Sequence, residues 1–246
     1  MPAYFASDVH LRGDRPERGL RFARWVDGLT PDDTLVIAGD LCDFWYASRQ
    51  VGTDMQACPG LQALAAFRSR GGAVTILPGN HDAWLGPYYE EALGADFVAG
   101  SLDVEAHGLR VHLVHGHLLR AGRRWKAWME SRAFQDAFRR IPSPMAHGLD
   151  WLLERNNERD RAEAERRHLA FFREYASSRS GTADVVVLGH VHTPVDDATA
   201  RPRMIVLGGW HRRSSFLRID DSGATPIIRP EGPVSPPSGP SPRSRA

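Results

Sequence analysis

The sequence lacks the features that mark several classes of protein. Its 246 residues include only two cysteines, Cys42 and Cys58, which form no CxxC pair, so neither a disulfide framework nor a cysteine-based metal site is expected. We expect both to be free thiols in a reducing compartment. No apolar run approaches the ~18–20 residues that span a bilayer. A formal net charge of +1 removes the usual electrostatic argument for a nucleic-acid binder.

The rest of the composition is that of an ordinary globular protein, with 42% hydrophobic and 25% charged residues. The first residues hold no basic region and no long apolar segment of the signal-peptide kind, so we expect a cytoplasmic protein. One residue type is abundant: the chain has 11 histidines. Imidazole ligates borderline metals and moves protons near neutral pH. The positions of these histidines therefore bear on function.

Apolar runs of strand length alternate with helical patterns along the chain. Helices are predicted over residues 17–29 and 61–70, between the first strands, and His107-Gly108 indicates a hairpin. The last two expected strands, residues 204–207 and 215–219, suggest that the chain ends in antiparallel strands. This order predicts an α/β fold with mixed sheets, in which ligands gather at the carboxyl ends of strands. The first expected strand ends just before Asp8. The others cover residues 33–38, 73–77, 102–106, 109–114, 184–188, 204–207 and 215–219.

Residues 118–180 differ from the rest of the predicted domain, which we expect to cover residues 1–229. They carry 14 basic and 9 acidic side chains, a local charge of +5 that leaves −4 elsewhere. Aromatic and aliphatic residues recur there at mostly three- and four-residue steps, so we expect a helical insert. Either it caps the core, or it is a lid with apolar surface for a lipid-like substrate or a membrane. Residues 230–246 are rich in Pro and Ser and are expected to be disordered.

Five short motifs each follow a predicted strand. Any one of them occurs by chance, but five in this order indicate a single composite site. Imidazole and carboxylate donors without thiolate suit Mn, Fe, Zn or Ni, and two such ions joined by a carboxylate can clamp a phosphoryl group. The motifs are Asp8-x-His10, Gly39-Asp40-x-x-Asp43, Gly79-Asn80-His81-Asp82, His115-Gly116-His117 and Gly189-His190-x-His192.

Together the motifs resemble those of the calcineurin-like metallophosphoesterases, over roughly residues 3–216. The resemblance implies a four-layer α/β/β/α sandwich around a dinuclear metal centre, with two divalent ions, Mn²⁺ in the first place and Fe or Zn as alternatives. It implies that Asp40 bridges the two ions. The same resemblance implies that one ion is held by Asp8, His10 and His192, and the other by Asn80, His115 and His190.

The resemblance also implies roles for two residues that hold no metal. His81 would face the phosphate and stabilise or protonate the leaving oxygen. Asp43, three residues after Asp40, would orient His81 by a hydrogen bond. The role of His117 stays open. The remaining five histidines are expected to be ordinary polar residues; they are His107, His112, His147, His168 and His211.

A closer resemblance is to one branch, the UDP-2,3-diacylglucosamine diphosphatases of lipid A biosynthesis. It rests on the helical insert and on the strings SDVHL, GDLCDFW, GNHDAWL and GHVHTP. That branch cleaves the pyrophosphate of a UDP-linked diacylated sugar to UMP and the acylated sugar phosphate. The resemblance implies a nucleotide-sugar lipid substrate and a peripheral position on the cytosolic face of the inner membrane. The substrate would contact Asn80 and His81, with Trp125, Trp128 and Phe138 of the insert.

Two other functions remain open. One is a soluble metallophosphoesterase that acts on nucleotides, phosphodiesters or phosphoproteins; His81 stands where members of the branch carry Arg. The other is a non-catalytic scaffold of the same fold, since a fold does not imply a function. Every expected ligand position is filled, which favours an enzyme over a scaffold.

Overall fold

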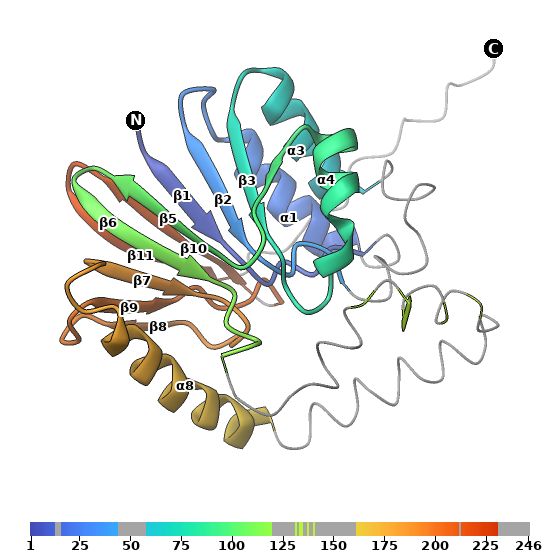
Figure 1. Ribbon diagram of the computed structural model, residues 1–246. Coiled ribbons are helices and arrows are strands. Elements are labelled where there is room, and N and C mark those ends of the chain that lie inside the picture. Colours follow the sequence, from blue (N-terminus) through green and yellow to red (C-terminus); the bar gives the residue numbers. More distant parts are fainter. Residues whose placement is uncertain are drawn as a thin grey trace, which may run out of the picture.

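The structure is a computed structural model. It describes residues 1–12, 16–43, 58–119, 161–211 and 213–230, with five single positions between 131 and 140. Its strands form two mixed sheets, one of six strands and one of five. The α/β fold predicted from the alternation of strand and helix patterns is confirmed (Figure 1).

The first sheet begins with three parallel strands joined through helices. These strands are β1 (Ala3–Ala6), β2 (Thr34–Ala38) and β3 (Ala73–Leu77). The helices are α1 (Pro16–Asp27) and α3 (Pro59–Ser69), both of which start at a proline, the residue best suited to a first helical turn. The predicted helices and strands of this half agree with the structure to within two residues.

The outer strands of the first sheet were harder to predict. The full order is β11-β10-β1-β2-β3-β4. A short 3-10 helix (Ala83–Leu85) and α4 (Gly86–Leu93) lead to β4 (Asp96–Phe97), which pairs with β3 over only two residues. On the other side, β10 (Arg213–Asp220) is antiparallel to both β1 and β11 (Gly223–Pro230). The sequence predicted β10 but not α4, β4 or β11.

The second sheet has the order β5-β6-β7-β9-β8. The hairpin predicted at His107-Gly108 is confirmed: it joins β5 (Ser101–Ala106) to β6 (Leu109–Val114). Next come β7 (Val185–Leu188), β8 (Val195–Asp197) and β9 (Arg203–Val206). The predicted antiparallel end is confirmed in part: β9 is antiparallel to β8 but parallel to β7, and it lies in a different sheet from β10. The sequence of β9 does not reveal which sheet it joins.

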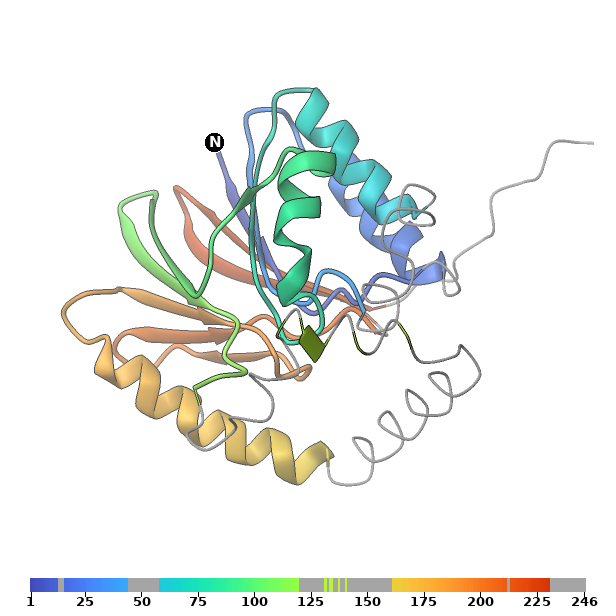
Figure 2. The ribbon, with the colours of Figure 1, turned by 45° about the vertical axis from the view of Figure 1, so that its right-hand side comes forward.

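Three apolar clusters separate four layers (Figure 2). The first packs α1, α3 and α4 on the first sheet, the second fills the space between the sheets, and the third packs α8 (Arg161–Ser178) on the second sheet. Phe22, Phe5 and Phe172, one from each cluster, are almost completely buried. The molecule is therefore the four-layer α/β/β/α sandwich that the sequence predicted.

The region of the predicted insert, residues 118–180, is described only in part. Its last helix, α8, is the outer layer on the second sheet, with Phe172 and Ala176 in the third cluster. The three aromatic residues predicted to contact substrate, Trp125, Trp128 and Phe138, lie outside the described residues. So do residues 231–246 of the predicted tail. No helix in the described ranges is both long and apolar enough to cross a membrane.

Candidate metal centre

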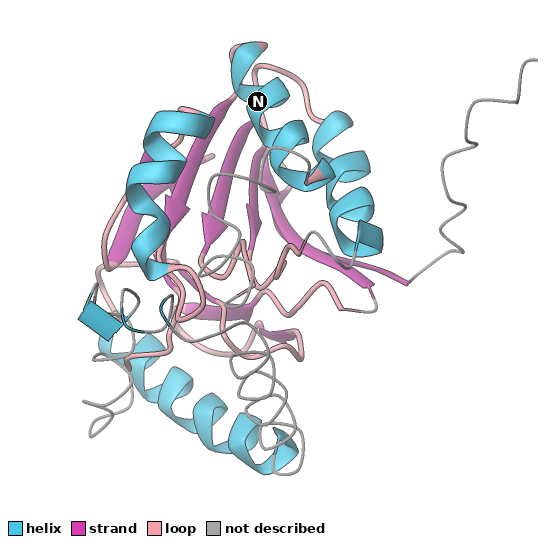
Figure 3. Ribbon diagram, turned by 90° about the vertical axis from the view of Figure 1, so that its right-hand side faces the viewer, coloured by secondary structure: helices cyan, strands magenta, loops and turns pink. Residues whose placement is uncertain are grey.

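The motif residues follow the carboxyl ends of five strands: β1, β2 and β3 in the first sheet, and β6 and β7 in the second. Both parallel sets point the same way, so their ends meet at one edge of the sandwich (Figure 3). Four of these residues have left-handed backbone angles, with φ between 51° and 64°: Asp8, His10, Asp40 and His190. A non-glycine residue in this region costs about 1–2 kcal/mol, and such strain gathers at functional sites.

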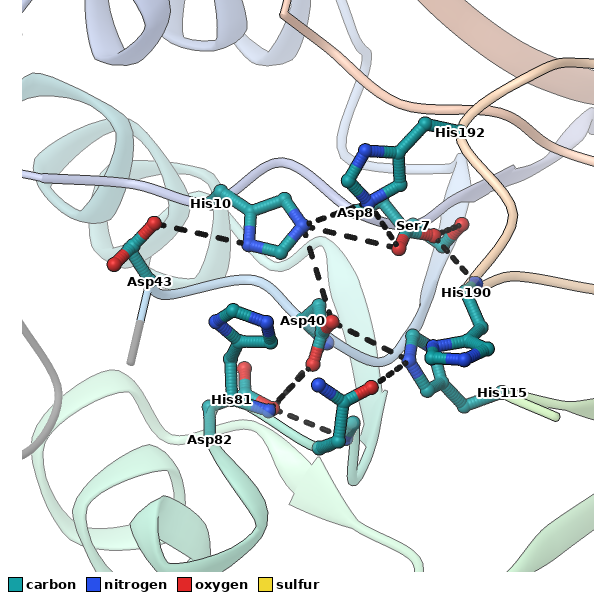
Figure 4. A network of polar contacts seen from close by, with 12 residues as sticks. Ser7, Asp8, His10, Asp40, Asp43, His81, Asp82, His115, His190 and His192 are labelled. Atoms are coloured by element: carbon teal, nitrogen blue, oxygen red, sulfur yellow. Dashed lines mark hydrogen bonds and ion pairs between the residues drawn. The ribbon is translucent and has the colours of Figure 1, made fainter. Parts of the chain in front are cut away.

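Asp40 lies at the centre of the cluster (Figure 4). Its Oδ2 lies 3.8 Å from Nε2 of His10 and 3.4 Å from Nε2 of His115. Its Oδ1 accepts a hydrogen bond from the backbone amide of His81 at 2.8 Å. One carboxylate oxygen therefore faces two imidazoles that come from different sheets.

Asp8, His10 and His192 form the first group of candidate ligands. The two Nε2 atoms of the histidines lie 3.2 Å apart, close to the separation of about 3.4 Å between two nitrogens bound to one tetrahedral ion. Oδ1 of Asp8 lies 3.4 Å from Nε2 of His192. This oxygen is buried and accepts no hydrogen bond from any described residue. An acceptor that faces two imidazole nitrogens in this way fits a cation.

The other carboxylate oxygen of Asp8 is fixed by the protein. Oδ2 accepts a hydrogen bond from the Ser7 hydroxyl at 2.6 Å and another from the backbone amide of His190 at 2.9 Å. The residue preceding Asp8 and a loop 182 positions away thus hold the same carboxylate. Only Oδ1 is left to face the two histidines.

His115 is the centre of the second group. Its Nδ1 donates to the carbonyl oxygen of Ala38 at 2.8 Å, so Nε2 is the nitrogen that faces the cluster. Nε2 lies 3.4 Å from Oδ1 of Asn80, and the rings of His115 and His190 are 5.5 Å apart. The structure therefore brings together the seven predicted ligands, from both sheets.

The electrostatics of the cluster follow from its burial. Burial, reinforced by His81, holds the pKa of His10 well below its ordinary value, which keeps its imidazole neutral. Burial acts in the same direction on His115, but the Asp40 carboxylate outweighs it and raises the pKa of His115 to about 10. His115 in turn holds the pKa of Asp40 well below its usual range, against the effect of burial. A divalent ion would take the place of the proton on His115.

The described side chains offer three overlapping groups of His and Asp that could hold a metal ion: Asp8, His10 and His192; His10, Asp40 and His81; and Asp8, Asp40 and His115. Asp40 belongs to two of them, and His81, for which no metal was expected, belongs to one. Each group combines imidazole nitrogens with carboxylate oxygens, a donor set that accepts Mn, Fe and Zn alike. The overlap through Asp40 is what a dinuclear site needs, because one carboxylate must reach both ions. The His and Asp clusters thus fit a dinuclear metal site.

The two residues predicted for catalysis lie beside the cluster. The His81 ring is 4.6 Å from the His10 ring in an edge-to-face arrangement. Oδ2 of Asp43 lies 4.0 Å from Nδ1 of His10, and its Oδ1 accepts a hydrogen bond from Arg12 at 3.4 Å. These contacts place Asp43 next to His10, and its action on His81 stays a prediction.

Asp82 is a buried residue of the site to which the sequence analysis assigned no role. Its Oδ1 accepts hydrogen bonds from the amides of Asp40 and Gly79, and its Oδ2 from the amide of Cys42 and the hydroxyl of Tyr89. Burial, and then the nearby Asp40, raise the pKa of Asp82 to about 6. In the sequence, the feature that could have pointed to Asp82 is its place at the end of the Gly79-Asn80-His81-Asp82 motif. Asp82 ties the loop after β2 to the loop after β3.

Three further histidines adjoin the cluster. His117 and His168 are buried, and their rings lie 5.1 Å from the His115 ring and 5.0 Å from the His190 ring. His211 is exposed and stacks on His192 at 4.7 Å. His168 and His211, which were expected to be ordinary polar residues, thus lie beside the cluster. Neither lies in a motif, so the sequence held no local signal.

Residues 1–194 match the family described as calcineurin-like phosphoesterase. The chain therefore belongs to this family, whose members are metal-dependent phosphoesterases. Among curated relatives, the UDP-2,3-diacylglucosamine hydrolase of Aeromonas salmonicida is 27% identical over 236 residues, which cover 88% of this chain and 89% of the relative. The hydrolase of the same name from Stenotrophomonas maltophilia is also 27% identical, over 92% of this chain and 97% of its own.

Solved structures are more distant. An archaeal phosphodiesterase is 15% identical, with a TM-score of 0.47, and the alignment covers 93% of this chain and 99% of that one.

Proposed function

We propose that this protein is a dinuclear-metal hydrolase that cleaves the pyrophosphate bond of UDP-2,3-diacylglucosamine, releasing UMP and 2,3-diacylglucosamine 1-phosphate. The observation that supports the reaction class is the position of Asp40, whose Oδ2 faces both His10 and His115. A pair of ions about 3.5–4 Å apart needs such a shared carboxylate.

The proposed ligands form two sets joined by Asp40. Two divalent ions bound there would activate a water molecule and neutralise charge on the phosphoryl oxygens. We propose Mn²⁺, with Fe or Zn as alternatives that the same donors accept. The first set is Asp8, His10 and His192, and the second is Asn80, His115 and His190.

His81 is the proposed group that protonates the leaving oxygen. Its backbone amide donates to Asp40 and its ring packs against His10, which supports a position of the imidazole beside a bound phosphoryl group. Proton transfer by a positioned histidine typically contributes 10²–10⁴-fold to a rate. Asp43 is the proposed positioning partner of His81. Asn80, besides its place among the ligands, would contact a phosphoryl oxygen.

The substrate proposal rests on the relatives that carry the name UDP-2,3-diacylglucosamine hydrolase and match about nine-tenths of both chains. The match extends beyond the motifs into the region of the predicted insert. Trp125, Trp128 and Phe138 of that insert are the proposed contacts for the acyl chains. The excess positive charge of residues 118–180 supports peripheral attachment to an anionic membrane, at the cytosolic face of the inner membrane.

The experiment is incubation of the purified protein with UDP-2,3-diacylglucosamine and Mn²⁺, then with a chelator, while UMP is measured. Release of UMP that the chelator abolishes is the expected result. If the protein hydrolyses only simple aryl phosphates, the assignment as a phosphoesterase stands and the proposed substrate is wrong. If the protein shows no metal-dependent hydrolysis of any phosphate ester, the proposal of an enzyme is wrong. The alternative of a non-catalytic scaffold would then be favoured.

A further inference from the structure

One face of α8 touches both ligand loops of the second sheet. Glu165, His168 and Phe172 are three and four residues apart, so their side chains project from the same side of the helix. One of these loops follows β6 and carries His115. The other follows β7 and carries His190.

The contacts to the loop after β7 come from the first two of these residues. Thr193 donates a hydrogen bond from its hydroxyl to Oε2 of Glu165 at 2.7 Å. The His168 ring lies 5.0 Å from the His190 ring at an interplanar angle of 76°, an edge-to-face contact. His168 is 7% exposed, so this contact is shielded from water.

The contact to the loop after β6 comes from Phe172, which is 1% exposed. This ring packs against Gly116, the residue between His115 and His117. A Cβ added at Gly116 would lie only 2.8 Å from the Phe172 ring, so the loop backbone rests directly on the helix. The one helix face therefore contacts the segments that carry two proposed ligands of the same metal position.

We propose that this face of α8 positions His190 and His115 and so sets the affinity of the metal position that they hold, with His168 as the positioning residue for His190. The inference rests on the proposed dinuclear centre. It assigns a task to a helix that carries no ligand itself. Groups that orient metal ligands in this way typically change metal affinity 10–100-fold when they are removed.

Two of the three ligands of the other metal position, Asp8 and His10, are held from the first sheet; the third, His192, lies in the loop after β7. Ser7 fixes Asp8, and Arg18 donates to the carbonyl oxygen of His10 at 2.9 Å. Neither contact involves α8. The ring contact of His168 is to His190. A change at His168 should therefore weaken the ion at His190 more than the ion at Asp8 and His10.

The test is a titration of metal-free protein with Mn²⁺, followed by electron paramagnetic resonance. The wild-type protein is expected to bind two ions per chain and to give the signal of a spin-coupled pair. His168→Leu replaces the imidazole with an apolar side chain of similar size. It should bind the ion at Asp8, His10 and His192 as the wild type does, and the ion at Asn80, His115 and His190 about 10–100-fold more weakly. At limiting Mn²⁺ its signal should be that of a single uncoupled ion.

Two controls separate positioning from a general loosening of α8. Tyr175→Phe removes the hydroxyl that bonds His112 and Arg179 at the far end of the helix, and Glu174→Ala changes an exposed residue of α8. Both should bind two ions as the wild type does. Thr193→Val, which loses the bond to Glu165, is a milder second variant of the loop after β7. It should weaken metal binding by about threefold, as loss of one hydrogen bond does, and the effect can reach both ions because Thr193 follows His192.

The inference is overturned if His168→Leu and Thr193→Val bind both ions with wild-type affinity. It is also overturned if Tyr175→Phe weakens the ion at Asn80, His115 and His190 as much as His168→Leu does. Failure of the wild-type protein to bind any Mn²⁺ would be a different result, because it would contradict the metal centre itself and this inference with it.

Discussion

The carboxylate of Asp82 accepts a hydrogen bond from the backbone amide of Asp40 at 3.2 Å. Since Oδ2 of Asp40 faces both His10 and His115, a fully buried carboxylate that is not among the proposed metal ligands fixes the backbone of the residue at the centre of the site. Tyr89, from α4, donates to the same Asp82 and connects the outer helical layer to this network.

Asp82→Asn should destabilise the protein more than Tyr89→Phe. Whichever way the new amide turns, its NH₂ group faces at least one backbone N–H, and each buried donor left unsatisfied costs about 1–3 kcal/mol. Tyr89→Phe removes a single hydrogen bond, worth about 1 kcal/mol. Urea unfolding with a chelator present measures both. Equal stability of Asp82→Asn and the wild type would show that the network does not hold the loops.

Asp40→Asn should lower kcat/KM for a soluble phosphodiester by at least about 10²–10³-fold. The amide oxygen can still accept the bond from His81, but the charge that two ions would share is lost. Metal content per chain and kcat/KM are the measurements. Asp184→Asn is the matched control, because this carboxylate pairs with Arg110 before β7, at the opposite end of that strand. Full activity of Asp40→Asn would end the metal proposal.

Gly79→Ala should displace Asp40. A Cβ at this position would lie 2.0 Å from Oδ1 of Asp40 and 2.3 Å from its backbone nitrogen, so the two loops must separate. We expect loss of metal binding and activity together. Gly71→Ala is the control: it has φ of +100° but open space around it, so it should cost about 1–2 kcal/mol of stability with no change in kcat/KM. Normal metal content in Gly79→Ala would contradict the geometry.

His211→Ala should lower kcat/KM for a phosphodiester or pyrophosphate about tenfold, with metal content unchanged. The exposed ring stacks on His192 and lies 5.4 Å from the His10 ring, at the solvent side of the cluster. A hydrogen bond to a charged phosphate group is worth about 1.5–3 kcal/mol, which supports that factor. If the variant instead loses metal in proportion to activity, His211 supports His192 and does not contact substrate.

Replacing Trp125, Trp128 and Phe138 together by Ser should reduce turnover of the diacylated nucleotide sugar far more than that of a small soluble phosphodiester. Acyl chains gain about 0.8 kcal/mol per buried CH₂, and apolar side chains in the insert would provide that burial. The ratio of kcat/KM for the two substrates is the readout. An equal fall for both would contradict a role of these residues in binding the lipid.

Much of the fold follows from local sequence. β2 and β3 are short apolar runs that end in Gly-Asp and Pro-Gly, and the helices that precede them, α1 and α3, start at prolines, so their bounds could be predicted closely. β11 was missed because Pro226 and Pro230 argue against a strand. The sheet tolerates them because β11 is its edge, where a missing N–H costs no ladder bond. β4 consists of two residues, and only its pairing with β3 defines it.

The sequence by itself determined which side chains gather at the candidate site, because each motif directly follows a strand and parallel strands end on one side of a sheet. Only the tertiary structure decided which oxygen of Asp40 faces both histidines, how Asp82 and Ser7 hold the carboxylates and loops, and that His168 and His211 adjoin the cluster. The physical reason is distance along the chain. His10 and His192 are 182 positions apart, and no local pattern encodes the packing of two sheets and α8 that brings them to 3.2 Å.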